Sequence, residues 1–509
     1  MRTESCLTGE NLLGDEFREV PFLDLPALVI ELPNKQSTQR SPSVFRSASR
    51  EDPVARARDE FLSGYQKQSP SSGGIPSTFR SRQHGNTFIP CGRACNDNCS
   101  DEETIPTTLL HPILGQFADD CRELELSAED HLLAGDLEIA MSKFYKDEAA
   151  RVEGVSMVLI KHKIHLNVSS KIPNSRYVMD ADMSVDKYRY VIAEFKNEAG
   201  GTQAEPFLEA IAYYVESTRE LAPKIPRSPL PCLLLAIYGP HIVFAGATWN
   251  RRPVVQVLSM PVAFHIHHTD DRLQLTVARH MAAFRRASEA LRTYYEQIGD
   301  IPIPLSTCPP AAKALFPYPT SYGTLTGNAV KTFQYKTQVV EKKLVFFATQ
   351  DDDGSCICVK FTQTYSVEAH QHLASRKCAP AMRGMKNLPG GWIMIVVDAL
   401  LEFETLYDRK EPLPSTLFVK MEKTLRDFHE HRFVHGDIRD VNIMVHKESI
   451  DEFRFIDLDW SGVSGLARYP ARINTLTIKR PPNVISRGII APEDDLFMLD
   501  GIRKLKCRD

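Results

Sequence analysis

The sequence predicts an α/β domain over residues 105–300, an α+β domain over residues 301–509 and a mostly disordered N-terminal region over residues 1–104. Residues 36–104 are rich in Ser, Pro, Arg, Gly and Asn and lack periodicity, which is typical of disordered chains. From about residue 105, short apolar runs alternate with helical patterns, and this alternation favours α/β structure. Six prolines between residues 302 and 319 mark the boundary between the two domains.

Composition restricts the class of protein and its compartment. A chain of 509 residues is too long for one ordinary core, which agrees with two domains. The net charge of −4 gives no global attraction to nucleic acid or to anionic membranes. No stretch is long and apolar enough to span a bilayer, and the start of the chain lacks the apolar run of a signal peptide. The 11 scattered cysteines favour reduced thiols, so we expect an intracellular protein of the cytoplasm or nucleus without membrane association.

The middle domain combines helical and strand patterns. Helical periodicity covers residues 113–152, and further helices are expected at 205–221 and 273–297. Strands are expected where short apolar runs occur, at 156–160, 188–193, 232–238, 241–245 and 254–258.

Polar residues accompany one of these strands. Asp180 precedes the strand at 188–193, which continues into Glu194 and Lys196. Side chains two apart on a strand face the same side, so Glu194 and Lys196 share a face. The alternative interpretation is an ordinary Glu/Lys pair on an exposed strand.

The Asp…Glu-x-Lys pattern resembles the PD-(D/E)xK nuclease fold, and the resemblance covers about residues 115–298. It implies that Asp180 and Glu194 hold Mg²⁺, that Lys196 orients or activates the attacking water, and that nucleic acid binds to the middle domain. Other candidates near this site are Asp182, which competes with Asp180, then Glu153 as a further ligand, and Glu209 and Tyr213 on the following helix.

The C-terminal domain begins with a hairpin signature. Two apolar strands at 343–349 and 356–361 flank an Asp-Gly turn. After them we expect a helix at 366–376, a strand at 392–397, a helix at 414–429 and two short strands at 442–445 and 452–456.

These elements carry the residue types that phosphoryl transfer requires, in the expected order. Asp437 is placed as the catalytic base, and Asn442, five residues later, is placed on Mg²⁺. Asp457 follows the next strand as the second Mg²⁺ ligand, and Lys360 on the strand at 356–361 is placed on the α and β phosphates of ATP. Arg439 stands where kinases place a lysine and is expected to pair with the transferred phosphate.

Three further positions complete the predicted nucleotide site. Glu368 on the helix at 366–376 is the expected ion-pair partner of Lys360. Asp398 and Leu400 follow the apolar strand at 392–397 and are expected to face the adenine. The segment at Asp457 resembles the Asp-Phe-Gly of kinases, but Asp459 replaces the glycine.

Residues 431–495 resemble the fungal-specific protein-kinase-like family, and the similarity extends over most of residues 311–509. The residues that carry it are the stretches 433–445 and 455–462, Tyr469, Pro470, Asn474, and the acidic run 493–495. The resemblance implies an ATP- and Mg²⁺-dependent serine/threonine protein kinase with a protein substrate. The order of a nuclease-like domain and a kinase-like domain resembles Crinkler-type effector proteins, although their usual leader motif is missing.

Two other functions stay open for the C-terminal domain. Its His-Gly-Asp motif at 435–437 also resembles choline and aminoglycoside kinases, which phosphorylate small molecules. No Gly-rich loop precedes Lys360, and the chain after residue 457 is short for the helical lobe of a protein kinase. Both departures favour a pseudokinase, in which Asp437 and Asn442 are only loop-capping residues.

Overall fold

A computed structural model describes residues 52–93, 104–299, 315–325, 327, 329–339 and 343–508. The chain divides into residues 1–50 and a compact unit from Glu51 to Asp509. The predicted disorder of residues 1–51 and 94–103 lies outside the described residues.

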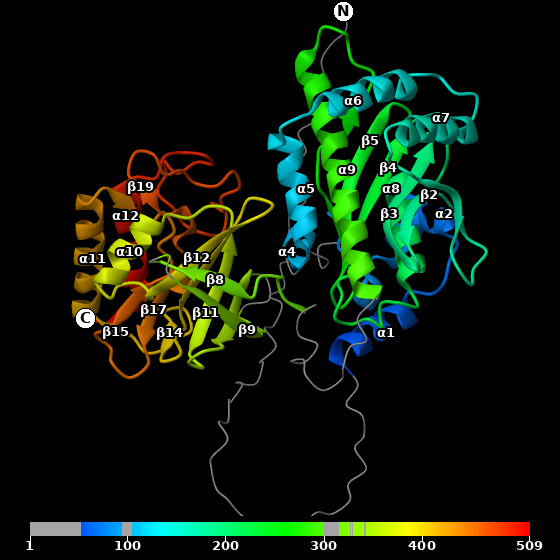
Figure 1. Cartoon of the computed structure of the whole chain (residues 1–509). Coiled ribbons are helices and arrows are strands. Elements are labelled where there is room, and N and C mark those ends of the chain that lie inside the picture. Colours follow the sequence, from blue (N-terminus) through cyan, green and yellow to red (C-terminus); the bar gives the residue numbers. More distant parts are fainter. Residues whose placement is uncertain are drawn as a thin grey trace, which may run out of the picture. The chain divides into compact units, whose positions relative to one another are not determined.

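The middle part of the chain is built on one mixed sheet (Figure 1). Its strands lie in chain order: β1 (Asn167–Lys171), β2 (Val178–Val185), β3 (Tyr188–Lys196), β4 (Cys232–Tyr238), β5 (His241–Trp249) and β6 (Pro253–Val257), while β7 (Val262–Ala263) pairs with β5. All neighbouring strands are antiparallel except β3 and β4, which are parallel. The helix α8 (Pro206–Thr218) supplies the crossover that a parallel pair requires.

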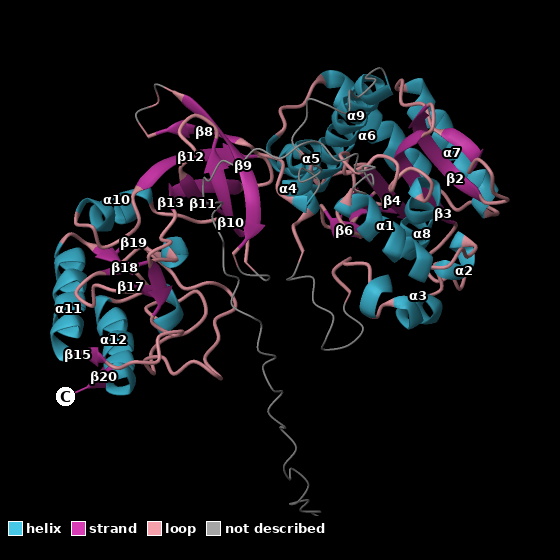
Figure 2. Ribbon diagram, turned by 90° about the horizontal axis from the view of Figure 1, so that it is seen from below, coloured by secondary structure: helices cyan, strands magenta, loops and turns pink. Residues whose placement is uncertain are grey.

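Helices cover both faces of the central strands. Nearly every residue of β3 and β4 is buried, and Figure 2 shows α8 on one side of these strands and α9 (Asp271–Gly299) on the other. The remaining helices are α4 (Thr107–Leu110), α5 (Pro112–Glu123), α6 (Ala128–Met141) and α7 (Glu148–Lys161). The strands predicted from residues 188, 232, 241 and 254 and the two long helices are confirmed.

The strand predicted at 156–160 is wrong, because these residues form the end of α7. The Asp147 side chain caps the helix by accepting a hydrogen bond from the Ala150 amide at 2.9 Å. Val152, Val155 and Leu159 then face the core, whereas Met157 is 65% exposed. The short apolar run was therefore one side of a longer amphipathic helix.

The prediction of disorder is wrong for residues 52–93. This segment forms α1 (Pro53–Gly64), α2 (Pro70–Gly73), α3 (Pro76–Arg82) and the 3₁₀ turn η1 (Gly85–Thr87). Each of the three α-helices begins with a proline, which is favourable in a first turn, so these prolines start helices. Phe61, Phe79 and Ile89 belong to the hydrophobic core of the middle part.

The C-terminal part begins with a closed six-stranded barrel, visible in Figure 2. Around the barrel the order is β10 (Val345–Gln350), β11 (Cys356–Thr362), β13 (Trp392–Asp398), β12 (Met382–Leu388), β8 (Ser321–Thr324) and β9 (Val330–Gln338). The predicted hairpin is confirmed, since β10 and β11 are antiparallel and pair Phe347 with Cys358. The helix α10 (Val367–Ser375) follows β11.

A smaller helical part follows the barrel. Two longer helices, α11 (Ser415–Glu430) and α12 (Pro492–Lys506), enclose a core in which Phe418, Leu425 and Phe455 are fully buried. Its short strands and turns are β14 (Phe403–Thr405), β15 (Leu413–Pro414), β16 (Phe433–Val434), η4 (Asp440–Asn442), β17 (Ile443–His446), β18 (Phe453–Phe455), η5 (Leu458–Trp460), β19 (Gly462–Val463) and β20 (Cys507–Arg508). A β-rich part followed by a short helical part gives the mixed α+β organisation that the sequence predicts.

In the part of the chain that the structure describes, no helix combines the length and apolar character needed to cross a bilayer. The intracellular location stays a prediction.

Candidate functional site

A cavity of about 500 Å³ opens beside the barrel strands β10, β11 and β13. Its lining is mostly apolar, with Val345, Ile395 and Met444 among the contributors. Of the predicted nucleotide-site residues, the lining includes Lys360, Asp398, Leu400 and Asp457. Its volume and its few polar groups suit a small organic ligand such as a nucleotide.

The predicted catalytic loop runs from β16 to η4 and is tied to the helix α12. The backbone amides of His435 and Gly436 donate to the two carboxylate oxygens of Asp495, each at 2.8 Å. Gly436 has a φ of 82°, and a Cβ at this position would lie 2.6 Å from Ile490. Both constraints require glycine here and fix the direction in which the following Asp437 points.

Asp437 is only 3% exposed, and its carboxylate is held by three side chains. Arg439 binds both oxygens, with Nε 2.9 Å from Oδ1 and a terminal nitrogen 2.5 Å from Oδ2. Asn442 donates its Nδ2 to Oδ2 at 2.7 Å. Arg480, which the sequence did not indicate, donates to Oδ1 at 2.8 Å. The structure thus brings Asp437, Arg439 and Asn442 together, as the motif predicts.

The other end of the Asn442 side chain has no partner. Asn442 is 1% exposed, and its Oδ1 accepts no hydrogen bond from any described residue. The amide of Ile456 donates to the Asn442 carbonyl at 3.0 Å, which brings the residue before Asp457 beside Asn442. A buried oxygen without a donor is costly, unless a cation or a ligand satisfies it.

Asp457 and Lys360 form a buried charge cluster at the cavity. The Lys360 ammonium contacts the Asp457 carboxylate and lies 2.6 Å from Asp459, while Lys343 lies 3.1 Å from Asp457. Asp457 adopts a left-handed backbone conformation with a φ of 63°, which aspartate tolerates better than most residues.

The two aspartates of this cluster differ in their pKa. Burial acts to raise the pKa of Asp457, but the ammonium groups of Lys360 and Lys343 hold it well below its usual range. Burial raises the pKa of Asp459 to about 6, against the opposing effect of Lys360 and with the added effect of Asp457. Asp457 is therefore the permanently charged member of the pair.

Glu368 is not the carboxylate that pairs with Lys360. It is exposed in the first turn of α10, where it accepts from Ser366 at 3.5 Å. The helix turns Ala369 and Leu373 inward, which leaves Glu368 facing outward. The Asp398 carboxylate, in turn, is bound by Arg383 at 2.5 Å.

The residues present suit ATP and Mg²⁺. Magnesium prefers hard oxygen ligands, and Asp457 and the unpartnered Oδ1 of Asn442 supply one carboxylate and one amide oxygen. Lys360 offers a cation for phosphate at the edge of the cavity.

The middle part holds the second predicted site. Asp180 lies within β2, the strand that precedes β3, and its carboxylate accepts from the Phe195 amide at 2.8 Å. Glu194 and Lys196 both lie near the end of β3 and are buried. Lys196 Nζ is 3.0 Å from Glu209 and 3.6 Å from Glu148, a residue of α7 that the sequence did not indicate.

Two other candidates lie outside this site. Asp182 is fully buried and paired with Arg189 at 2.7 Å, so it does not take the place of Asp180. Glu153 is exposed. The acidic member from α7 is instead Glu148, whereas the predicted Glu209 of α8 does lie beside Lys196.

The middle site brings several carboxyl groups close together in the protein interior. Burial and the neighbouring carboxylates of Asp180 and Glu209 raise the pKa of Glu194 well above its usual range. Burial also raises the pKa of Asp180. Glu194 is 1% exposed, and its Oε1 has no hydrogen-bond partner among the described residues. These groups fit a divalent cation, which would satisfy the free oxygen and offset the repulsion.

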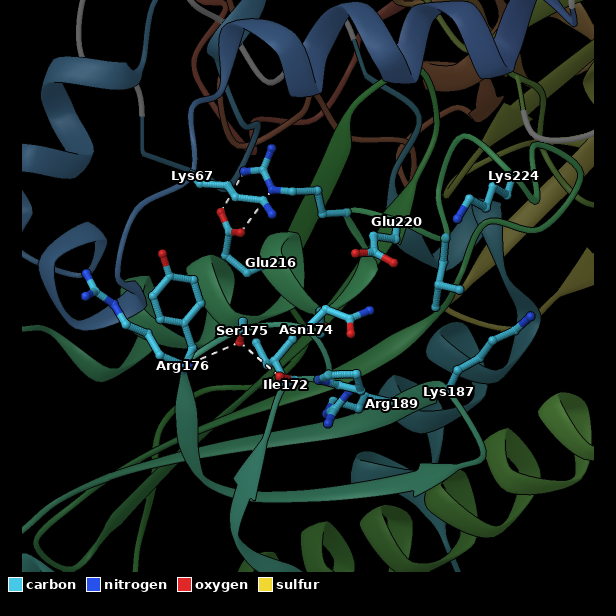
Figure 3. Close-up of a pocket in the computed structure, with 15 residues that line it drawn as sticks. Lys67, Ile172, Asn174, Ser175, Arg176, Lys187, Arg189, Glu216, Glu220 and Lys224 are labelled. Atoms are coloured by element: carbon cyan, nitrogen blue, oxygen red, sulfur yellow. Dashed lines mark hydrogen bonds and ion pairs between the residues drawn. The ribbon is translucent and has the colours of Figure 1, made fainter.

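A different hollow of about 430 Å³ lies in the middle part, and Figure 3 shows the charged side chains around it. Six cationic residues line it, but Arg189 is paired with Asp182 at 2.7 Å and Arg219 with Glu216 at 2.6 Å. The other four are exposed: Lys67, Arg176, Lys187 and Lys224. Flexible surface cations of this kind do not define a site.

Comparison with known proteins gives little guidance. No protein-family model and no curated protein matches this chain. One similar solved structure is the kinase PK-1 of Cydia pomonella granulovirus, which is 14% identical with a TM-score of 0.29. The match covers 33% of this chain and 65% of that kinase, slightly under two thirds of its length. A third of the chain is thus distantly similar in structure to a protein kinase, and no activity follows from a similarity of this size.

Proposed function

We propose that the C-terminal part is an ATP-dependent phosphotransferase, and specifically a serine/threonine protein kinase of the fungal-specific type. The observation that carries the proposal is the buried, unpartnered Oδ1 of Asn442, whose Nδ2 binds Asp437 at 2.7 Å. One residue thereby connects the candidate base to the candidate metal position, as phosphoryl transfer requires.

The residues divide the chemistry between them. ATP occupies the 500 Å³ cavity, with the adenine toward Asp398 and Leu400 and the phosphates toward Lys360. Asn442 and Asp457 would hold Mg²⁺, which would offset the charge of the phosphate oxygens. Asp437 accepts the proton of the attacking hydroxyl, and Arg439 pairs with the transferred phosphate through the terminal nitrogen that does not bind Asp437. Lys360 exchanges its contact with Asp457 for the phosphates when ATP binds.

The test is ATP turnover by the purified chain with Mg²⁺, compared with the near-isosteric variants Asp437→Asn and Asp457→Asn. Loss of a general base typically lowers turnover by about a hundredfold or more, so Asp437→Asn should lose nearly all activity. Asp457→Asn removes a proposed Mg²⁺ ligand and should lose nearly all activity for that reason. Glu368→Gln is the control, because Glu368 is exposed and does not contact Lys360. Activity that survives in Asp437→Asn would contradict the assigned base.

The same assay distinguishes the substrate classes. Labelled protein supports a protein kinase, whereas turnover only with alcohol metabolites supports a small-molecule kinase. Turnover at the level of the variants would support a pseudokinase, for which the contact between Lys360 and Asp457 and the missing Gly-rich loop are the present arguments.

A second activity is favoured by the middle site, namely metal-dependent hydrolysis of nucleic acid. The supporting observation is the buried Glu194, whose Oε1 lacks a partner beside Asp180 and Lys196. Lys196 is 8% exposed, and it would orient water if a metal took its place as the partner of these carboxylates.

Hydrolysis is tested with DNA and RNA in Mg²⁺ or Mn²⁺. We expect Lys196→Met to lower cleavage by about a hundredfold, since it removes the group that orients or activates water. Lys171→Met on β1 is the matched control, because Lys171 is exposed on the same sheet. Equal cleavage by both variants would indicate a contaminating nuclease or another site.

A further inference from the structure

The candidate base is engaged by an arginine from a distant segment. Arg480 donates to Asp437 Oδ1 at 2.8 Å, and its guanidinium lies 5.1 Å from the ring centre of Trp460. Arg480 is only 9% exposed, although it belongs to a loop that is mostly exposed. We call residues 471–490 the latch segment.

The hydrogen bonds to Asp437 leave no free acceptor position. Oδ1 accepts from Arg439 and Arg480, while Oδ2 accepts from Arg439 and Asn442. A carboxylate has about four lone-pair sites, so the four contacts fill them. A base must accept a hydrogen bond from the attacking hydroxyl before it takes the proton, and at least one of these contacts therefore has to break.

Arg480 is the partner that breaks away without dismantling the loop. Arg439 and Asn442 belong to the same loop as Asp437, and Arg439 has a second role on phosphate. The latch segment is anchored by few buried apolar groups, chiefly Val484 and Ile490. Elsewhere it is exposed, with Leu476 97% and Ile485 65% exposed. Segments with few buried contacts open at low free-energy cost.

We propose that Arg480 is an autoinhibitory latch, which holds the base of the C-terminal site in an unreactive state until the latch segment moves. This inference rests on the proposed phosphotransferase function. In the closed state the positive charge of Arg480 stabilises the carboxylate and occupies the approach of the hydroxyl. In the open state Oδ1 keeps its contact with Arg439 and gains one free acceptor position, and the buried charge of Asp437 is still compensated by Arg439.

The test compares Arg480→Met with wild type and with Arg472→Met, an exposed arginine in the same segment. We expect Arg480→Met to raise ATP turnover by about five- to tenfold, as expected for the loss of one charge-assisted hydrogen bond, and Arg472→Met to leave it unchanged. Arg480→Lys, which keeps the positive charge but lacks the planar guanidinium with its several N–H donors, should give an intermediate rate of ATP turnover. If Arg480→Met folds poorly, the rate of Arg480→Lys still tests the proposal.

Hydrogen exchange of residues 471–490 gives a readout that does not depend on activity. The latch predicts faster exchange in Arg480→Met and in Asp437→Asn, and no further increase when the two changes are combined.

Three results would overturn the inference. Turnover of Arg480→Met at or below the wild-type level would make Arg480 a positioning residue of the base. Unchanged exchange in both variants would show that the contact does not hold the segment. Faster exchange with no turnover in any variant would mean that the phosphotransferase proposal itself fails and that Arg480 is a structural contact only.

Discussion

At the scale of single residues, the cluster at the cavity places two neighbouring aspartates in opposite electrostatic states. Asp457 faces two lysines, whose charges hold its pKa low, and Asp459 is kept near a pKa of about 6 chiefly by burial. The ordinary value for both is 3.8. In the absence of ligand, the two residues therefore make opposite contributions to the dependence of stability on pH.

The direction in which Asp459 changes stability with pH follows from its raised pKa. Its contribution to stability is fully present below about pH 3.8 and is lost as the pH rises through about 6. Asp459→Asn should remove this loss and gain up to about 3 kcal/mol over wild type near pH 7. Urea unfolding of wild type and of Asp459→Asn at pH 5 and pH 7.5 measures this difference in the free energy of unfolding. A variant that loses as much stability as wild type between these two pH values would contradict the assignment.

Residue-level prediction from sequence worked where chemistry is encoded in short motifs. Asp437, Arg439 and Asn442 lie together because five residues of one loop fix their distances. Arg480 and Glu148 were missed, since each reaches its site from a distant segment and no local pattern marks it. Glu368 was assigned by analogy of position, and the orientation of α10 turns it outward.

At the scale of elements, α1 shows how a polar segment becomes part of a core. Arg58 is fully buried, and its guanidinium donates to five backbone carbonyls, those of Asn250, Ala222, Ile225, Ser228 and Trp249. Such carbonyls near strand ends and turns need donors, which α1 supplies. Burial lowers the pKa of Arg58 to about 10, so the group stays charged at neutral pH.

The prediction at this scale concerns stability. Arg58→Met should destabilise the protein by about 3–5 kcal/mol, because it leaves buried carbonyls without a donor. Arg56→Met is the matched control, since Arg56 is exposed and pairs with Glu60 at 2.9 Å, and it should change stability by less than about 1 kcal/mol. Urea unfolding followed by tryptophan fluorescence measures the stability of both variants. Equal stability of the two variants would contradict the structural role of α1.

Prediction of elements failed where composition or local pattern was ambiguous. The prolines of residues 53–76 contributed to a composition typical of disordered chains, but they occupy first turns of helices. The strands β9 and β12 went unpredicted, because neither has an excess of apolar residues, and the pairing with β10 and β13 defines them.

At the scale of the whole molecule, the chain contains two candidate sites with separate chemistry. The pair Asp437 and Asn442 belongs to the C-terminal part, and Glu194 and Lys196 belong to the sheet of the middle part. The proline-rich boundary between the two predicted domains lies mostly outside the described residues and stays a prediction. The contribution of residues 52–93 to the middle core could not be predicted from sequence, since it depends on long-range packing.

Because the two candidate sites use different residues, a substitution in one site should leave the activity of the other site unchanged. Asp437→Asn should leave any cleavage of nucleic acid unchanged, and Lys196→Met should leave ATP turnover unchanged, because neither residue contacts the other site. Each variant thus controls for global damage in the other assay.

The most direct test of the central claim is Mg²⁺-dependent ATP turnover by the full chain beside Asp437→Asn and Asp457→Asn. The assignment of base and metal ligand predicts measurable turnover in wild type and a loss of about a hundredfold or more in each variant. Equal turnover in all three proteins, or none in wild type and in Arg480→Met, would contradict a phosphotransferase at this site.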